Sequence, residues 1–192
     1  FVPSDPQVPY PVFAFTGLAA WGLTASALRS AMQSLSGNAY LVSKVAFPRE
    51  VLPLASGLVA LVDFAVTLVL LGGLLLWFGL PMHPTALLLP LVVLVQLAFT
   101  IGLALLLAAA NLWWNDVRHV FDVGITLWLF ATPVLYPLPV VDGAVGTLLS
   151  LNPMTPIVSA YRDLLLNGTL PAAGPALAAV LASVGMFVVG LT

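Results

Sequence analysis

The chain has 192 residues, of which 61% are hydrophobic and 6% are charged, with a net charge of −2 and a mean hydropathy of +1.14. A soluble domain carries about 25% charged residues, so this composition excludes an ordinary water-soluble fold. It predicts an all-α, polytopic membrane protein, because lipid can replace water around apolar helices. Runs such as LVLLGGLLLWF do not alternate apolar and polar residues, which excludes a transmembrane β-barrel.

The same composition limits the chemistry. There is no basic block, so we expect no nucleic-acid partner. There are no cysteines, which excludes disulfides, a thiol nucleophile and a cysteine-type metal site. Phe1 opens a loop-like run and Thr192 lies in an apolar stretch, so we read residues 1–192 as one membrane domain cut from a longer protein.

A helix needs about 20 apolar residues to cross the hydrocarbon core. We interpret five apolar segments as spans, the last of them truncated at the chain end; they cover 12–28, 51–78, 86–110, 123–138 and 175–192. The Gly- and Pro-rich run at 79–85 predicts a turn between the second and third spans.

The stretch before the last span, LLSLNPMTPIVSAYRDLLLNG, is apolar but broken by prolines and by Arg162 and Asp163. It predicts a short helix at the membrane surface, capped by Asn152 or Thr155 and ended by the Asn-Gly pair at 167–168. Adjacent helical residues point about 100° apart, so Arg162 and Asp163 should not pair directly. Arg162 could meet a lipid phosphate or be a surface charge without a ligand.

The distribution of Lys and Arg sets the orientation. Arg29, Lys44, Arg49 and Arg118 fall in the first and third connections between spans, whereas Arg162 lies on the opposite side. We therefore expect segments 29–50 and 111–122 to be cytoplasmic.

The cytoplasmic segment at 38–50 contains Lys44, Arg49 and Glu50 within seven positions. Asn38 could cap a short amphipathic helix that Pro48 ends. Such a helix can lie on the bilayer with Lys44 reaching the interface, or it can contact a cytoplasmic partner.

Several other polar residues are candidates. Asp63 lies near the middle of its span, so it either lines a substrate route or is a hydrogen-bonded structural acid. Trp128, Thr132 and Tyr136 are spaced by four, which places them on one helix face. Such a face suits sugar rings, but it also suits ordinary packing.

A metal site is not expected. Asp116, His119 and Asp122 rotate too far round a helix to converge, and Arg118 among them would repel a cation. These residues instead predict a polar boundary of the membrane.

Three blocks occur in the order found in a known family: GNAYLVSKVAFPREVLPLASGLVALVDF, NLWWNDVRHVFDVGITLWLFATPVLYPL and LNPMTPIVSAYRDLLLNG. With them, nearly the whole chain resembles the ABC-2-type permeases that export polysaccharides such as O-antigens and teichoic acids. One departure is Asn115, where the family often has a basic residue.

The resemblance implies a six-span permease of the bacterial cytoplasmic membrane, whose first span precedes this chain. It implies a homodimer with two separate ATP-binding subunits and a lipid-linked glycan as substrate. A coupling helix is implied at 38–50, and short helices at the outer leaflet are implied at 143–171. The residues implied in coupling are Tyr40, Lys44, Pro48, Arg49 and Glu50.

The chain is not expected to hydrolyse ATP itself, because its single lysine, Lys44, follows no G-x-x-x-x-G run. ATP and Mg would bind to the partner subunit, and we expect no cofactor in this chain. The implied substrate path contains Asp63, Trp128, Thr132 and Tyr136, and the implied outer-leaflet region contains Asn152, Arg162 and Asp163.

Three alternatives remain open from the sequence. The same fold could export a drug or a small lipid. A membrane glycosyl- or phosphotransferase would require acids, His or Arg clustered at one membrane face, whereas the acids here are scattered. A passive channel would conduct without an ATPase partner.

Overall fold

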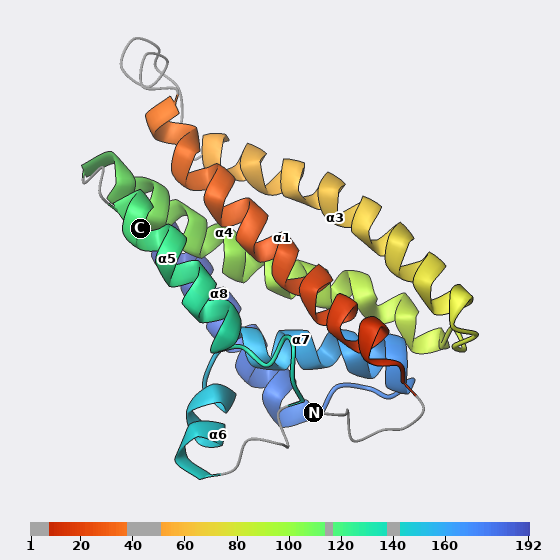
Figure 1. The fold of residues 1–192 in the computed structure, drawn as a ribbon. Coiled ribbons are helices and arrows are strands. Elements are labelled where there is room, and N and C mark those ends of the chain that lie inside the picture. The colour runs from red at the N-terminus through yellow and green to blue at the C-terminus, as the bar shows by residue number, and fades with distance from the viewer. Residues whose placement is uncertain (1–7, 38–50, 114–116, 138–142) are drawn as a thin grey trace.

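The computed structural model describes residues 8–37, 51–113, 117–137 and 143–192 (Figure 1). All regular secondary structure within these ranges is helical. The helices are α1 (Tyr10–Gly37), α3 (Val51–Trp77), η1 (Pro84–Leu88), α4 (Leu89–Trp113), α5 (Val117–Phe130), α6 (Gly143–Ser150), α7 (Met154–Arg162), η3 (Asp163–Asn167) and α8 (Ala173–Leu191).

Four helical segments of the described chain are long and apolar enough to cross a membrane. They are Tyr10–Ser34, Leu54–Trp77, Pro84–Asn111 and Ala173–Leu191. These segments match the first, second, third and fifth predicted spans, and the all-α polytopic architecture is confirmed.

The fourth predicted span differs from the structure. We expected a helix over 123–138, but α5 runs from Val117 to Phe130 and has only 14 residues. A helix of that length rises about 21 Å, less than the hydrocarbon thickness of about 30 Å. Pro133 explains the early end, because proline has no N–H to donate and disfavours helical backbone at the residue before it.

Helix α1 lies at the centre of the fold and packs against both α3 and α4, while α4 packs against α8. Most of the apolar part of α1 is buried, whereas α8 is largely exposed. Small buried side chains on α1, among them Ala20, Ala27 and Ala31, allow neighbouring helices to approach closely. The exposed apolar faces of α3 and α8 are suited to contact with lipid.

The contact between α4 and α8 depends on two glycines. A Cβ atom added at Gly102 would overlap the backbone carbonyl of Met186, and one added at Gly190 would overlap the backbone of Gly102. The two helix backbones are therefore in direct contact here, which is a common way for membrane helices to associate.

Two glycines with positive φ end helices. Gly79, with a φ of 67°, follows α3 and opens the predicted turn, and Gly168, with a φ of 65°, ends η3. The predicted Asn-Gly stop is thus confirmed. The His83 ring lies against Gly168, so the turn after α3 is packed against the end of η3.

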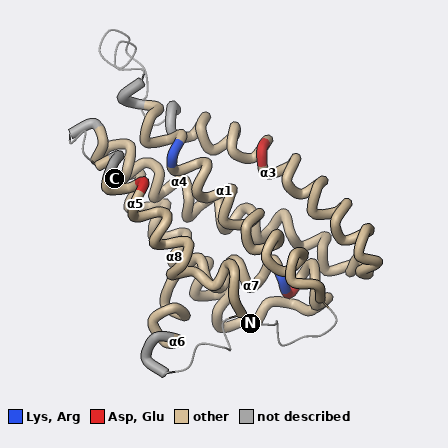
Figure 2. Tube along the Cα trace, viewed as in Figure 1, with Lys and Arg blue, Asp and Glu red and all other residues tan. Residues whose placement is uncertain are grey.

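The short helices gather at one end of the bundle, where α7 lies across the long helices (Figure 1). Charged positions are sparse along the described helices (Figure 2). At the opposite end from α7, Arg29 of α1 and Asp122 of α5 form a 3.9 Å ion pair, with both side chains about half exposed. The pair joins the two regions that the sequence predicts to share one side of the membrane.

Candidate functional site

The first polar centre at the α7 end is Asn152, which directly precedes that helix. Its Nδ2 donates hydrogen bonds to Oγ1 of Thr132 at 2.8 Å and to the Ala131 carbonyl at 3.1 Å. Its Oδ1 accepts from Nε1 of Trp128 at 3.2 Å and from the backbone N–H of Met154 at 3.0 Å. The N-cap residue of α7 is Pro153, which makes no side-chain cap hydrogen bond, so Asn152 lies one residue before the cap position that we predicted for it. Its side chain still accepts from the first backbone N–H of α7, and its other bonds fix the start of α7 to the end of α5.

Thr155, the other predicted cap, has a different role. It lies in the first turn of α7, and its buried hydroxyl donates to the carbonyl of Leu149 at 2.6 Å. It therefore ties α7 to α6 instead of capping α7.

The predicted helical face of Trp128, Thr132 and Tyr136 does not form, which corrects the sequence interpretation. Helix α5 ends at Phe130, so only Trp128 lies on it. The chain then turns, and the Tyr136 hydroxyl donates back to the Phe130 carbonyl at 2.8 Å. Burial raises the pKa of Tyr136.

Trp128 and Thr132 face the interior of the single chain. The Trp128 ring packs edge-on against Trp21, with centroids 5.2 Å apart, and against Phe99, with centroids 6.2 Å apart. Thr132 is fully buried. Contact of these side chains with a glycan stays a prediction.

Arg162 is the second polar centre, and the structure corrects its description as a surface charge. It is 93% buried at the end of α7, and its two terminal nitrogens donate to the carbonyls of Pro133 at 2.7 Å and Val134 at 2.5 Å. The guanidinium carbon lies 3.7 Å from the centre of the Phe13 ring, a cation–π contact.

The space around Arg162 is closed by α1. A Cβ atom at Gly17 would lie 2.6 Å from the Val134 carbonyl oxygen and 2.7 Å from a guanidinium nitrogen. Burial lowers the pKa of Arg162 to about 10, which still keeps the group charged at neutral pH. Arg162 therefore connects α7, the turn after α5 and α1 with a single side chain. Its contact with a lipid phosphate stays a prediction, and both terminal nitrogens already have protein acceptors.

Asp163 follows Arg162 but points elsewhere. Its Oδ1 accepts a 3.1 Å hydrogen bond from Nδ2 of Asn167, and the side chain is partly exposed. Within the described ranges it forms no ion pair with Arg162, as the angular spacing predicted. Burial raises the pKa of Asp163.

The sequence interpretation missed a buried network one residue earlier. The Tyr161 hydroxyl donates to Oε1 of Gln96 at 2.6 Å, and Nε2 of Gln96 donates to the Ala20 carbonyl at 2.6 Å and to Oγ1 of Thr24 at 2.9 Å. The Thr24 and Thr100 hydroxyls lie 3.2 Å apart. The sequence did contain a signal for this network. Gln96 is an amide inside the apolar run of the third span, and a polar residue in a span needs a hydrogen-bond partner inside the protein.

Asp63, the predicted mid-membrane acid, is exposed on α3 in the single chain. It lines a small cavity of about 130 Å³ between α3 and α1, together with Gly22, Ser26 and Thr67. Thr67 donates to the backbone carbonyl of Asp63 at 3.0 Å. The role of Asp63 in a substrate path stays a prediction.

The predicted coupling segment at 38–50, with Tyr40, Lys44, Pro48, Arg49 and Glu50, lies outside the described residues. Near that segment, the structure describes the ion pair of Arg29 with Asp122.

The fold and these contacts define a class, a multi-pass helical membrane protein whose short helices are fixed across one end of the bundle. The chain is 36% identical over 179 residues, 91% of its length, to the O-antigen export system permease protein RfbA of Myxococcus xanthus. It is also 31% and 29% identical to two proteins of the same name from Klebsiella pneumoniae, over 85% of its length in each case. No protein-family model matches.

The chain belongs to the family of ABC-2-type O-antigen export permeases. This confirms the resemblance found in its sequence and identifies a transporter subunit instead of an enzyme. The chain spans 68% of the Myxococcus protein and 64% of each Klebsiella protein.

Proposed function

We propose that this chain is the membrane-spanning part of a permease that exports a lipid-linked polysaccharide across the cytoplasmic membrane of a bacterium. The observation that carries the proposal is the 36% identity to an O-antigen export permease over 91% of the chain. The spanning helices and the rarity of charge along them support the same conclusion.

The energy for export comes from ATP hydrolysed, with Mg, by a separate subunit. The absence of a P-loop from the sequence supports this division of labour. The functional unit contains two copies of the permease and two ATP-binding subunits. The segment at 38–50 transmits the motion of the motor, and Lys44, Arg49 and Glu50 supply its charged contacts.

The α7 end has a structural role in this mechanism. Asn152, Tyr161 and Arg162 fix α7 to α5, α4 and α1, so a movement of these helices at the motor end reaches the short helices at the outer leaflet. The glycan route passes Asp63 and the end of α5, where Trp128, Thr132 and Tyr136 lie.

The test is to purify the full-length permease and identify what accompanies it. We expect a stoichiometric ATPase whose activity rises with undecaprenyl-linked glycan, and loss of surface polysaccharide when the permease is deleted. Stimulation by a drug or a small lipid but not by the glycan would assign the fold another cargo. Conductance without an ATPase partner would contradict powered transport.

A further inference from the structure

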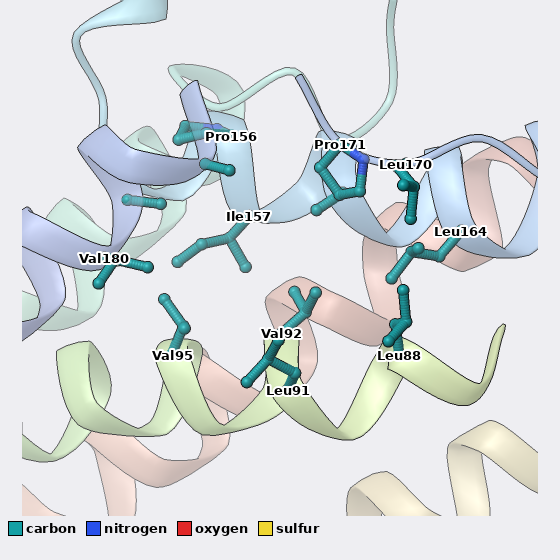
Figure 3. A pocket seen from close by; sticks show the side chains of 13 residues that line it. Leu88, Leu91, Val92, Val95, Pro156, Ile157, Leu164, Leu170, Pro171 and Val180 are labelled. Carbon is teal, nitrogen blue, oxygen red and sulfur yellow. The ribbon is translucent and has the colours of Figure 1, made fainter. Parts of the chain in front are cut away.

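Two cavities adjoin at the α7 end of the bundle. The first has a volume of about 330 Å³ and lies between η1 and α4, α7 and the start of α8 (Figure 3). All the residues that line it are apolar, and Val92, Ile157 and Val180 point into it from three different helices. Leu91 and Val180 on its rim are exposed, so the cavity opens on the side of the bundle that faces lipid.

The second cavity, about 320 Å³, is lined by prolines and alanines together with four polar residues, Ser150, Thr155, Ser159 and Asp163. Pro156, Pro171 and Ala176 line both cavities, so the two are adjacent. We call the pair the groove; its apolar half lies between membrane helices, and its polar half is the neighbouring cavity that carries the four polar side chains.

The groove lies at membrane-surface depth. Its walls come from the first turns of α4 and α8, where both spanning segments begin. That is the level at which lipid head groups meet acyl chains. A molecule that fills both halves must itself be apolar at one end and polar at the other.

The polar half offers acceptors to its occupant. The Thr155 and Ser150 hydroxyls already donate to the carbonyls of Leu149 and Thr147 at 2.6 and 2.7 Å, so their oxygens are left to accept. The Asp163 carboxylate accepts only. Arg162 does not neutralise it directly, because its terminal nitrogens bond to Pro133 and Val134.

A head group that ends in a phosphate or pyrophosphate would place its negative charge directly beside Asp163, with no free cation among the described residues that line the groove. A primary ammonium carries three N–H donors and a positive charge, which complements this acceptor set.

We propose that the groove between α4, α7 and α8 binds a bilayer phospholipid with a primary ammonium head group, of the phosphatidylethanolamine type. One acyl chain occupies the apolar half, and the ammonium donates to Asp163. The bound lipid fills the gap between the short helices and α8. The test of this site counts bound lipid and does not depend on transport.

The experiment uses the full-length permease, purified in mild detergent and titrated with phosphatidylethanolamine, phosphatidylcholine or phosphatidylglycerol of the same acyl composition. Bound lipid is counted by native mass spectrometry. We expect wild type to retain phosphatidylethanolamine about tenfold more strongly than either other lipid, the size of one charge-assisted hydrogen bond. The head group of phosphatidylcholine has the same positive charge but no N–H donor. The difference in retention between phosphatidylethanolamine and phosphatidylcholine therefore measures the contribution of the hydrogen bond.

Asp163→Asn should abolish this preference, whereas Asp122→Asn, at the opposite end of the bundle, should keep it. Ala176→Phe fills the shared wall and should reduce retention of all three lipids, whereas Leu177→Phe on the exposed neighbouring position should not. Ala176→Phe also keeps the acid, so it tests the groove if Asp163→Asn fails to fold. Equal retention of the three lipids by wild type, or stronger binding of phosphatidylglycerol, overturns the proposal.

Discussion

The hydroxyl of Tyr161 donates a 2.6 Å hydrogen bond to Oε1 of Gln96, joining a short helix at the end of the bundle to the centre of a membrane span. Both side chains are completely buried. Gln96 continues the connection to α1 through the Ala20 carbonyl and Thr24. The position of α7 is therefore set by a polar network inside an otherwise apolar bundle.

The Tyr161–Gln96 bond should be measurable by a double-mutant cycle. Tyr161→Phe removes the donor and leaves Oε1 of Gln96 buried without a partner, which should cost about 1–2 kcal/mol of unfolding free energy. Combination with Gln96→Leu should show a coupling energy of about 1 kcal/mol in detergent unfolding.

Tyr136→Phe is the matched control, because that hydroxyl donates to the nearby Phe130 carbonyl, six residues away at the bundle end. If Tyr161→Phe lowers the unfolding free energy no more than Tyr136→Phe does, and shows no coupling to Gln96, the hydrogen-bond network does not determine the position of α7.

Arg162 should not be replaceable by lysine. Its fork reaches two successive carbonyls, of Pro133 and Val134, and a lysine ammonium lacks that planar geometry. We expect Arg162→Lys to lower the thermal stability of the purified permease clearly, and Arg162→Met to cost about 2–4 kcal/mol by leaving both carbonyls unpaired.

Arg29→Lys provides the comparison, because Arg29 forms an ion pair with half-exposed side chains. It should change stability by less than about 1 kcal/mol. If lysine is tolerated equally at both positions, the fork at Arg162 has no special role.

The contact between α4 and α8 should fail when Gly102 or Gly190 gains a side chain. Alanine at either site would force the backbones of the two helices apart, and overpacking of this kind costs about 1–3 kcal/mol. Gly185→Ala in the same α8 helix meets no atom within 4 Å and should be neutral or stabilising. Thermal unfolding of the three variants shows how much stability each alanine costs. A loss of stability at Gly185 equal to that at Gly102 would contradict the close contact between α4 and α8.

The orientation of the chain can be tested by cysteine labelling, because residues 1–192 contain no cysteines of their own. We expect Lys44→Cys to react with an impermeant maleimide only after the cells are permeabilised, and Thr169→Cys, exposed at the α7 end, to react from outside. Labelling of Lys44→Cys in intact cells would reverse the topology and remove the coupling role of the segment at 38–50.

Reversal of both charges at Arg49 and Glu50 should uncouple ATP hydrolysis from export while membrane insertion continues. The control is the double variant Arg29→Asp with Asp122→Arg, which keeps opposite charges at the two paired positions. This control should preserve export. The readouts are ATPase activity and surface polysaccharide. Unchanged export in the Arg49 and Glu50 variant would remove these residues from coupling.

Much of the architecture follows from the sequence, since crossing a bilayer requires long apolar runs with internally satisfied backbone. The boundaries of α3 match the predicted span to within one residue, and Gly168 ends its segment where expected. The fourth span was misjudged because apolar content continues past Phe130, while the backbone is interrupted at Thr132-Pro133. Apolar composition indicates which segments are buried in lipid, but it does not indicate where a helix ends.

The side-chain roles depended on the tertiary structure. Sequence spacing showed that Arg162 and Asp163 diverge, but not that one points into the bundle and the other into a polar cavity. Asn152 was identified as a cap, yet its bonds to Trp128 and Thr132 join residues 20 to 24 positions away. The sequence alone determined a membrane-spanning, helical protein, because solvent preference and local periodicity are properties of contiguous residues. The transporter class came from the resemblance of three sequence blocks to a known family. Only the packed chain decided which polar groups meet, because each buried donor in an apolar bundle must find its acceptor on another helix.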